Sequence, residues 1–569
     1  MQPAAERVPA HLRRFVVEQD YEQYTAVDQA VWRFVLLQTY SKLLDTAHPA
    51  YRDGLRQTGI SVERIPSIAE MNEKLARFGW GAVCVDGFIP PRAFTEFQAR
   101  GLLPIAADMR TRAHLVYTPA PDIIHEAAGH APILPDAGYA SYLRRIGEIS
   151  GEAFTLPEET QVFDAIYALS EIKENPSATP EQLAAADAAL EVAQAAAKEA
   201  SEAQRLSRLY WWTAEYGLVG RVDAYKIYGA GILSSLWESH ACHDPSVRKL
   251  PLDEGCLDVS YDITRPQPQL FVVRDFEALH DLLDDVSATL AARQGGAVAL
   301  RAAMRSREVC SVRLSSGAHA MGVLREVGPR LERPGWLGFD GRVRVSFSAD
   351  TPACELNGDA AWVFSGRLED GARLEDVELR RELGKRVRLR FESGALVEGV
   401  LLRLTPRPDQ KLSHAELADV SLSIPGKPRQ ELPHFMLFVA DEVVTARAGA
   451  IDSGYYEETE FSGTRVPKPR EYSECDWALM DLYEAASQAH SRGAASVRTD
   501  FPLIHDKLVQ SFSEEWLLRW NMLESLLKVG VGPSLQSALV AELEALELHF
   551  DRKEPIASGL RYLSRLAAA

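Results

Sequence analysis

The chain has 569 residues, 46% of them hydrophobic and 25% charged, so it is long enough for two or three domains with at least one large core. Its formal net charge of −19 argues against nucleic acids and anionic membranes as partners, because the overall field repels both. The opening segment has no continuous apolar stretch, and the six cysteines lie far apart without a CxxC pair. We therefore expect a cytoplasmic globular protein with neither an export signal nor a zinc ribbon.

Four segments with different patterns follow one another. Residues 1 to 20 form a tail, and residues 21 to 295 are mainly helical, with short strand-like runs between Gly79 and Ala107. Residues 300 to 455 alternate as strands do, and GKRVRLRFESGALVEGVLLRL would fit a small five-stranded barrel. Residues 456 to 569 are helical again. The predicted fold is a mainly α domain with a small β element, then a β-rich module and an α-helical C-terminal region.

The sequence around Thr179 carries a clear signal for the start of a helix. Thr179 is suited to an N-cap, Pro180 to the first helical position and Gln182 to a capping box. An Ala-rich helix is therefore predicted from here to about Leu206, most simply as a surface helix.

The sequence HEAAGH places His125 and His130 five residues apart. At about 100° per residue, this spacing leaves the two side chains roughly 140° apart on a regular α-helix. Gly129 is of the type that ends helices, and Asp122 could cap a helix starting near Ile123. Such a helix would carry one histidine in its first turn and the other just past its end. A metal clamp and a hydrogen-bonded structural pair remain equally open.

Glu215 is the best candidate for a third metal ligand. It lies in YWWTAEYGL, an aromatic-rich segment where an unpaired carboxylate would be costly to bury. An ion pair with an arginine is the alternative. Two imidazoles and one carboxylate leave three positions open, which lets Fe(II) bind O₂ beside a second substrate.

Three motifs together resemble the pterin-dependent aromatic amino acid hydroxylases, in that family's order. They are YTPAPDIIHEAAGHAPILPD, RLYWWTAEYGL and KIYGAGILSSLWES, and the similarity extends over residues 30 to 291. The resemblance implies that His125, His130 and Glu215 bind Fe(II), and that the cofactor is a tetrahydropterin such as tetrahydrobiopterin. It most closely suggests a bacterial phenylalanine 4-monooxygenase type with an additional C-terminal half.

The resemblance also assigns residues to the two organic ligands. It implies that Phe94 stacks on the pterin, that Glu126 meets the pterin directly or through water, and that Arg110 pairs with the substrate carboxylate, with Arg112 as a possible substitute. Backbone contacts to the pterin fall to Gly87, Phe88 and Ile89. Thr118, Trp211, Gly231 and Ser234 match the substrate pocket, and Tyr210 and Glu238 match positions near the iron.

The chain departs from the family pattern in several places. Tyr216 stands where a phenylalanine is usual, and Pro90 and Pro91 replace small hydroxyl residues beside the pterin. The helix from Thr179 resembles an insertion. The N-terminal regulatory domain and short tetramerisation helix of the animal enzymes are not evident, and residues 300 to 569 have no assigned role.

The sequence thus predicts an enzyme that uses O₂ and a tetrahydropterin to hydroxylate an aromatic amino acid, most simply L-phenylalanine to L-tyrosine. Its partners would be these small molecules, with no nucleic acid and no membrane, and an oligomer is possible. Three alternatives stay open: tryptophan or another aromatic acid as substrate, a zinc-dependent hydrolase, and a non-catalytic sensor of aromatic amino acids.

Overall fold

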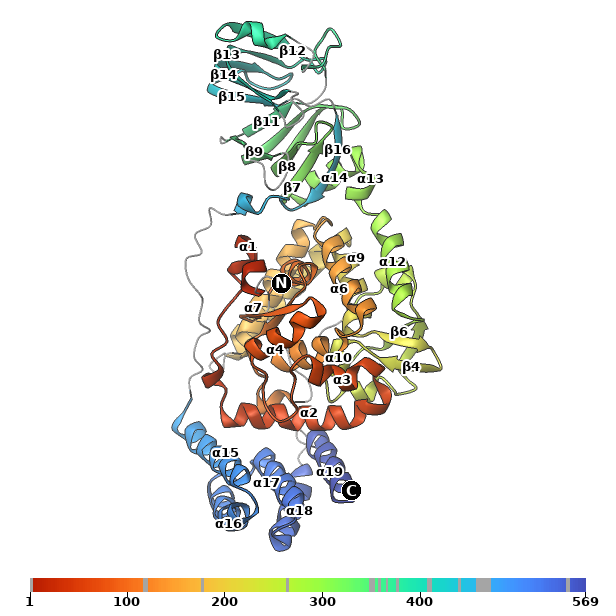
Figure 1. Cartoon of the computed structure of the whole chain (residues 1–569), viewed down its shortest axis with the longest axis vertical. Helices are drawn as coiled ribbons and strands as arrows, with labels where there is room; N and C mark the ends of the chain where they lie inside the picture. Colours follow the sequence, from red (N-terminus) through yellow and green to blue (C-terminus); the bar gives the residue numbers. More distant parts are fainter. Residues whose placement is uncertain are drawn as a thin grey trace.

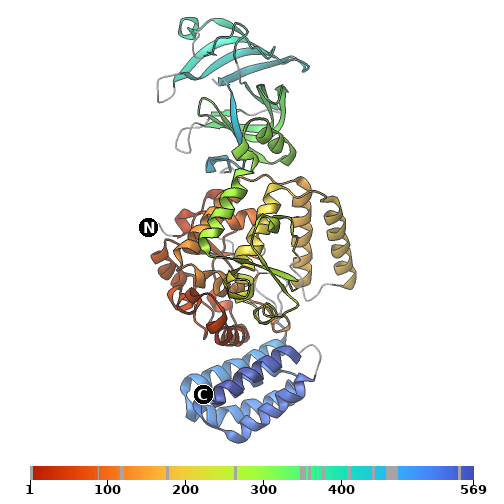
Figure 2. The same cartoon turned by 90° about the vertical axis from the view of Figure 1, so that its right-hand side faces the viewer.

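The computed structural model describes residues 4–87, 89–115, 121–174, 179–261, 266–346, 354–356, 360–364, 367–374, 378–406, 412–438, 442–456, 472–548 and 553–568. These residues form three parts stacked along the long axis of the molecule (Figure 1). A mainly helical body lies in the middle, β-sheets lie at one end and the C-terminal helices lie at the other, as the perpendicular view also shows (Figure 2). None of the described helices is both long and apolar enough to cross a membrane.

The first part of the body contains the predicted N-terminal helices. The elements are α1 (Ala10–Arg13), α2 (Ala26–Thr46), α3 (Pro49–Gln57), α4 (Ile68–Leu75), β1 (Gly81–Val85), α5 (Pro91–Ala99) and β2 (Leu102–Ala106). Strands β1 and β2 are parallel, so the chain needs a crossover between them, and α5 supplies it. The sequence predicted only strands and loops there, whereas Pro91 occupies the first turn of a helix.

The second part of the body carries the candidate site. Its elements are η5 (Ile124–His130), α6 (Ala137–Ser150), α7 (Pro157–Glu174), α8 (Pro180–Ala196), α9 (Glu202–Tyr210), η7 (Trp211–Glu215), β3 (Leu218–Arg221), β4 (Ala224–Ile227), α10 (Ala230–Leu233), α11 (Glu238–Ala241), β5 (Arg248–Pro251), β6 (Gln269–Val273) and α12 (Phe276–Ala288). Four short strands form a sheet in the order β4-β3-β6-β5. The sequence predicted helix where β3 and β4 lie, because strands of four residues are too short to reveal their period.

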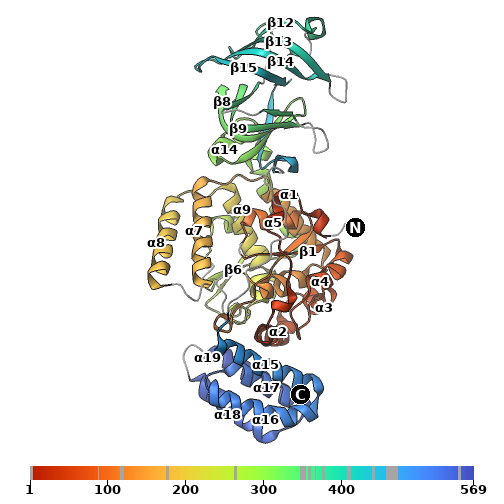
Figure 3. The same ribbon diagram turned by 90° about the vertical axis from the view of Figure 1, so that its left-hand side faces the viewer.

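The helix predicted from Thr179 is present and is one of a pair. The capping box of Thr179 and Gln182 is formed, which confirms the predicted start of α8. The helix ends at Ala196 rather than near Leu206, because Ser201 caps a new helix, α9, by accepting from the Gln204 N–H at 3.1 Å. Helices α7 and α8 lie side by side at the edge of the body (Figure 3).

The β part follows two short helices, α13 (Ala291–Gln294) and α14 (Gly296–Ser306). One sheet has the order β10-β9-β8-β7-β16, with β11 also pairing with β9. The other has the order β12-β13-β14-β15. The bounds are β7 (Val309–Leu314), β8 (His319–Pro329), β9 (Pro334–Ser346), β10 (Cys354–Leu356), β11 (Ala360–Phe364), β12 (Arg386–Arg390), β13 (Leu396–Pro406), β14 (Leu412–Ser423), β15 (Gln430–Phe438) and β16 (Val443–Ala448).

The expected small barrel is not confirmed. The segment GKRVRLRFESGALVEGVLLRL forms β12 and β13 of an open four-stranded sheet, and among the described strands β12 does not pair with β15 to close it. Closure is unnecessary because the apolar face of this sheet is covered by Trp336, Trp362 and Phe364 from β9 and β11. The apolar residues are therefore buried without a barrel.

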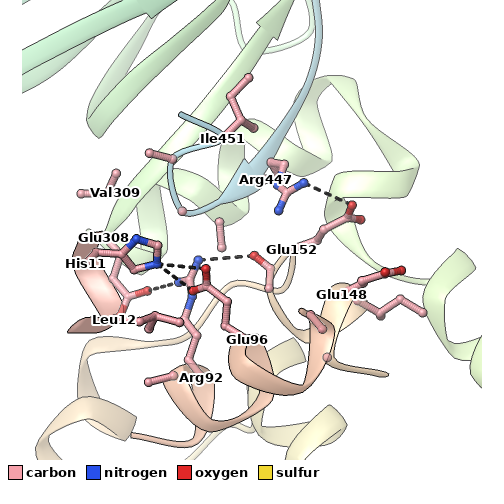
Figure 4. A pocket seen from close by; sticks show the side chains of 18 of the residues that line it. His11, Leu12, Arg92, Glu96, Glu148, Glu152, Glu308, Val309, Arg447 and Ile451 are labelled. Atoms are coloured by element: carbon pink, nitrogen blue, oxygen red, sulfur yellow. Dashed lines mark hydrogen bonds and ion pairs between the residues drawn. The ribbon is translucent and has the colours of Figure 1, made fainter. Parts of the chain in front are cut away.

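The β part meets the body across a junction that surrounds a cavity of about 1450 Å³ (Figure 4). The Ala448 N–H donates to the Glu152 carbonyl at 3.1 Å, which fixes the end of β16 to the body. Charged side chains complete the contact, with ion pairs Arg92–Glu308 at 3.3 Å and Arg447–Glu152 at 3.4 Å. The junction thus combines charged pairs with an apolar contact of Phe154, which joins the core of the first β-sheet.

The C-terminal helices are α15 (Glu474–Arg492), α16 (Ala494–Ser511), α17 (Trp516–Val529), α18 (Pro533–Glu547) and α19 (Lys553–Ala568). Their apolar residues belong to the same hydrophobic core as those of the body. The contact is made largely on α2, where the Phe34 ring lies 5.1 Å from Trp516 and 4.8 Å from Trp520, centroid to centroid. The expected domain boundaries stay a prediction.

Candidate metal centre and active-site cavity

His125 and His130 lie in one π-helical segment, η5. The sequence predicted that the helix ends between them, which is wrong, because the helix widens and continues through His130. A π-helix closes i→i+5 hydrogen bonds, so residues five apart lie nearly above one another. Gly129 is needed for another reason: a Cβ there would lie 2.7 Å from the Ala230 carbonyl oxygen, so glycine lets α10 pack closely.

Glu215 ends a second π-helical segment, η7, and points to both histidines. Its Oε2 lies 3.2 Å from His125 Nε2, and its Oε1 lies 3.1 Å from His130 Nε2. All three ligand atoms lie within 4.8 Å of one another. Two ligands at right angles, each about 2.1 Å from one ion, are separated by about 3 Å. The observed spacing therefore fits a two-histidine, one-carboxylate metal site.

Ser234 orients the first histidine. Its Oγ donates to the Ala230 carbonyl at 2.7 Å and lies 3.1 Å from His125 Nδ1. The single hydroxyl proton is already used, so the hydroxyl can only accept from His125, and Nδ1 carries the proton. When the ring is neutral, Nε2 then keeps its lone pair, which is the form that binds a metal.

The charges at this site respond to burial and to one another. Burial alone would raise the pKa of Glu215, but His130 and His125 outweigh it and hold that pKa far below its ordinary value. Burial raises the pKa of Glu126 to about 7. Glu126 Oε2, His130 Nε2 and Glu238 Oε1 are buried without a hydrogen bond to any described residue. Unpaired buried atoms are rare, and these surround the space that an ion and its ligands would fill.

Arg110 is held by a buried ion pair with Asp122. Nε donates to Oδ2 at 2.7 Å and Nη2 donates to Oδ1 at 2.8 Å, and both side chains are almost fully buried. The same carboxylate accepts from the His125 N–H at 3.0 Å, as the predicted cap should. Burial opposes its charge, but Arg110 outweighs this and lowers the pKa of Asp122. Asp122 thus connects the arginine to the start of the metal-binding helix.

A cavity of about 230 Å³ lies beside the candidate metal centre. It brings together most of the residues expected from the sequence: Gly87, Ile89, Phe94, Arg110, His125, Glu126, Tyr210, Trp211, Glu215, Gly231, Ser234 and Glu238. His130 is fully buried behind its wall, with its ring 5.9 Å from that of Phe94. Phe88 and Thr118 lie outside the described residues.

Stacked aromatic rings form one wall of the cavity. Trp211 lies between Tyr216, at 4.7 Å, and Tyr261, at 4.2 Å between ring centroids. The Tyr261 hydroxyl lies 3.0 Å from that of Ser207, which also lines the cavity. The wall is therefore rigid and largely apolar, as an aromatic ligand requires.

Comparison with known proteins identifies the family. Residues 18–162 and 178–297 match the sequence pattern of the family described as biopterin-dependent aromatic amino acid hydroxylase. The phenylalanine-4-hydroxylase of Ralstonia nicotianae is 30% identical over 270 residues, which are 47% of this chain and 72% of that protein. The enzyme of the same name from Chromobacterium violaceum is 30% identical over 271 residues, 47% and 76% of the two chains. This chain belongs to the biopterin-dependent aromatic amino acid hydroxylases.

A solved structure has also been matched to this hydroxylase. It is the phenylalanine hydroxylase of Chromobacterium violaceum with bound iron(III) and the oxidised cofactor 7,8-dihydrobiopterin, 25% identical, with a TM-score of 0.38 and coverage of 51% of this chain and 91% of that one.

This hydroxylase adds elements of its own to the cavity. Helix α7 contributes Ile166 and Ser170 to the wall, and both fall in residues 163–177, which the family pattern does not match. Sequence reasoning missed them, together with Ser207 and Tyr261, because no local motif distinguishes them. The sequence placed an insertion at α8, whereas the residues that the family pattern does not match, 163–177, include most of α7.

Proposed function

We propose that this hydroxylase converts L-phenylalanine to L-tyrosine, using O₂ and a tetrahydropterin, at Fe(II) bound by His125, His130 and Glu215. The observation that carries the proposal is the meeting of these three ligand atoms within 4.8 Å beside a cavity of about 230 Å³. The names of the relatives support phenylalanine as substrate, and the description of the family supports the pterin. A cytoplasmic location and an oligomeric state stay predictions.

Bound at the three ligands, Fe(II) would supply the open positions at which O₂ is activated with electrons from the pterin. The residues of the protein bind the iron, the pterin and the amino acid and orient them for the reaction. Ser234 keeps His125 in the metal-binding tautomer, and the charge of Glu215 is stabilised by both imidazoles. The rest of the cavity would exclude water and hold the pterin close to the aromatic ring of the amino acid.

Arg110 is proposed to bind the carboxylate of the amino acid. Asp122 accepts hydrogen bonds from Nε and Nη2 of Arg110, whereas Nη1 donates to no described residue. Nη1 is therefore left for the substrate carboxylate. The buried ion pair fixes the plane of the guanidinium before the substrate arrives, so little side-chain entropy is lost on binding. Trp211 and its stacked neighbours would then enclose the aromatic ring, with Gly231 completing the pocket.

The pterin is proposed to bind on the side of β1 and α5. Phe94 offers a ring for stacking, Gly87 and Ile89 offer backbone groups, and Glu126 offers a carboxyl group whose Oε2 has no hydrogen bond to a described residue. Tyr210 accepts a hydrogen bond from Gln98 Nε2 at 2.6 Å, which fixes its ring beside the same space. Tyr210 would thus act by shaping the site around the iron.

The test is O₂ uptake by protein loaded anaerobically with Fe(II), given tetrahydropterin with each aromatic amino acid, while products are followed by mass spectrometry. We expect uptake coupled to tyrosine formation, lost in His125→Ala and Glu215→Ala and kept in His243→Ala, an exposed histidine outside the cavity. Preferred turnover of tryptophan would change the substrate alone. Hydrolysis with zinc, or amino-acid binding without pterin oxidation, would overturn the proposal.

A further inference from the structure

Glu515, just before α17, is a buried carboxylate with several partners. Its side chain is 5% exposed. The Tyr483 hydroxyl donates to Oε1 at 2.7 Å, and the Leu517 N–H donates to the same oxygen at 3.1 Å. The guanidinium of Arg112 forms an ion pair with Oε2. These contacts hold the carboxylate in one place and leave Arg112 as its counter-charge.

Arg112 belongs to the segment that carries the proposed substrate arginine. Arg110 precedes it by two residues and is bound by Asp122 through both its backbone N–H, at 3.0 Å, and its side chain. This short segment is therefore held from two sides, by Asp122 within the body and by Glu515 from the C-terminal helices. Such a double attachment limits the positions that the Arg110 guanidinium can adopt.

Helix α17 is itself fixed to the body at a second point. Glu524 is fully buried and pairs with Arg33 of α2 at 3.2 Å and with Lys528 at 2.7 Å. The aromatic contact of Phe34 with Trp516 and Trp520 supports the same face. The apolar contact of Phe34 with Trp516 and Trp520 holds α17 against α2 whether or not Glu524 is paired, so the position of Glu515 is fixed. All of α17 lies beyond the residues that match the family.

We propose that Glu515 is a positioning residue for the amino-acid site: through Arg112 it holds the segment that bears Arg110, so the C-terminal helices set the affinity for the amino acid. This inference depends on the proposed function only in assigning the substrate carboxylate to Arg110. It gives residues 472 to 548 a task in the reaction, although none of their side chains lines the active-site cavity.

The test compares two buried carboxylates associated with one helix. Glu515→Gln breaks the ion pair beside Arg110, and Glu524→Gln is the matched control, because it breaks a pair with α2 instead. Arg112→Gln breaks the first pair without altering the cap of α17, so it serves if Glu515→Gln folds poorly. The measurements are KM for phenylalanine, KM for tetrahydropterin, kcat, and amide hydrogen exchange of peptides covering residues 108 to 115.

Glu515→Gln and Arg112→Gln should each raise KM for phenylalanine roughly tenfold and speed exchange in this segment, with little change in KM for the pterin. The double variant should be no worse than either single variant, since both remove one interaction. Glu524→Gln should leave KM and exchange in this segment unchanged.

Two results would overturn the proposal. One is a Glu515→Gln protein that behaves like Glu524→Gln in both KM and exchange. The other is a double variant whose effect is the product of the single effects, because Arg112 would then act independently of Glu515. Exchange needs no turnover, so if the wild-type protein hydroxylates no amino acid, unchanged exchange in Glu515→Gln still overturns the proposal, and faster exchange still supports it.

Discussion

The hydroxyl of Ser234 lies 3.1 Å from Nδ1 of His125 while it donates its own proton to a backbone carbonyl. The serine thereby fixes the tautomer of a proposed iron ligand. Ser234→Ala should weaken Fe(II) binding by roughly 10- to 100-fold, because Nδ1 loses its acceptor. Ser235→Ala is the control, since Ser235 lines the same cavity without contacting His125. Anaerobic titration with Fe(II) measures the affinity of both variants. Equal affinities would contradict the role of Ser234 in fixing the His125 tautomer.

The close packing of the π-helix on α10 predicts the effect of a methyl group. In Gly129→Ala the new Cβ would meet the Ala230 carbonyl at 2.7 Å, so the free energy of unfolding should fall by about 1–3 kcal/mol and Fe(II) binding should weaken. Gly151→Ala is the control, because the nearest atom there lies at 3.3 Å. Urea unfolding of the metal-free wild type and of both variants measures the change in the free energy of unfolding. Equal stability would mean that α10 moves away freely.

Glu238 predicts a dependence of stability on pH. Burial raises the pKa of this carboxyl to about 7 from its ordinary 4.5. Between these values the folded protein keeps a proton that the unfolded chain has lost, so Glu238 makes stability fall as pH rises through this window. Glu238→Gln copies the protonated form. Its advantage over the wild type should grow from pH 5 to pH 8 by up to about 3 kcal/mol, as measured by chemical unfolding. A pH-independent difference would exclude the buried proton.

The wall that α7 adds to the cavity predicts a role in ligand size. Ser170→Trp places an indole at the edge of a space of about 230 Å³, so KM for phenylalanine or for the pterin should rise, roughly tenfold or more. Ala168→Trp adds the same ring on the exposed side of the same helix and should have no effect. Steady-state kinetics with each ligand varied in turn shows which one the wall limits. If Ser170→Trp and Ala168→Trp have the same KM values, α7 lies too far from the ligands to limit their size.

Removing the β part and removing the C-terminal helices should have different effects on the remaining protein. Gly295 lies against Val444 near the start of β16, so residues 296 to 443 can be replaced by a short Gly/Ser linker. We expect this protein to fold and retain hydroxylation, because the junction includes charged pairs and the β part buries most of its apolar residues in its own two cores. Removing residues 457 to 569 should instead give aggregation, because the apolar face of α2 around Phe34 would be exposed. Size-exclusion chromatography and O₂ uptake test both.

Local patterns in the sequence determined several elements directly. The N-cap Thr179 with Gln182 placed the start of α8, since a capping box needs only four neighbouring residues. The alternation in β12 buries Val387 and Leu389 and exposes the arginines between them, because a strand turns successive side chains to opposite faces. His125, His130 and Glu215 were selected by residue type and spacing, and the resemblance of three motifs indicated the family.

Only the tertiary structure decided how these residues meet. The packing of η5 on α10 depends on the close approach of Gly129 to Ala230, a residue distant in the sequence. The open sheet in place of a barrel depends on tryptophans supplied by another sheet. The ion pair of Arg112 with Glu515 joins residues far apart in the chain. Spacing and periodicity report which side chains share a face of one element, whereas contacts between elements depend on how the whole core packs, which no local pattern encodes.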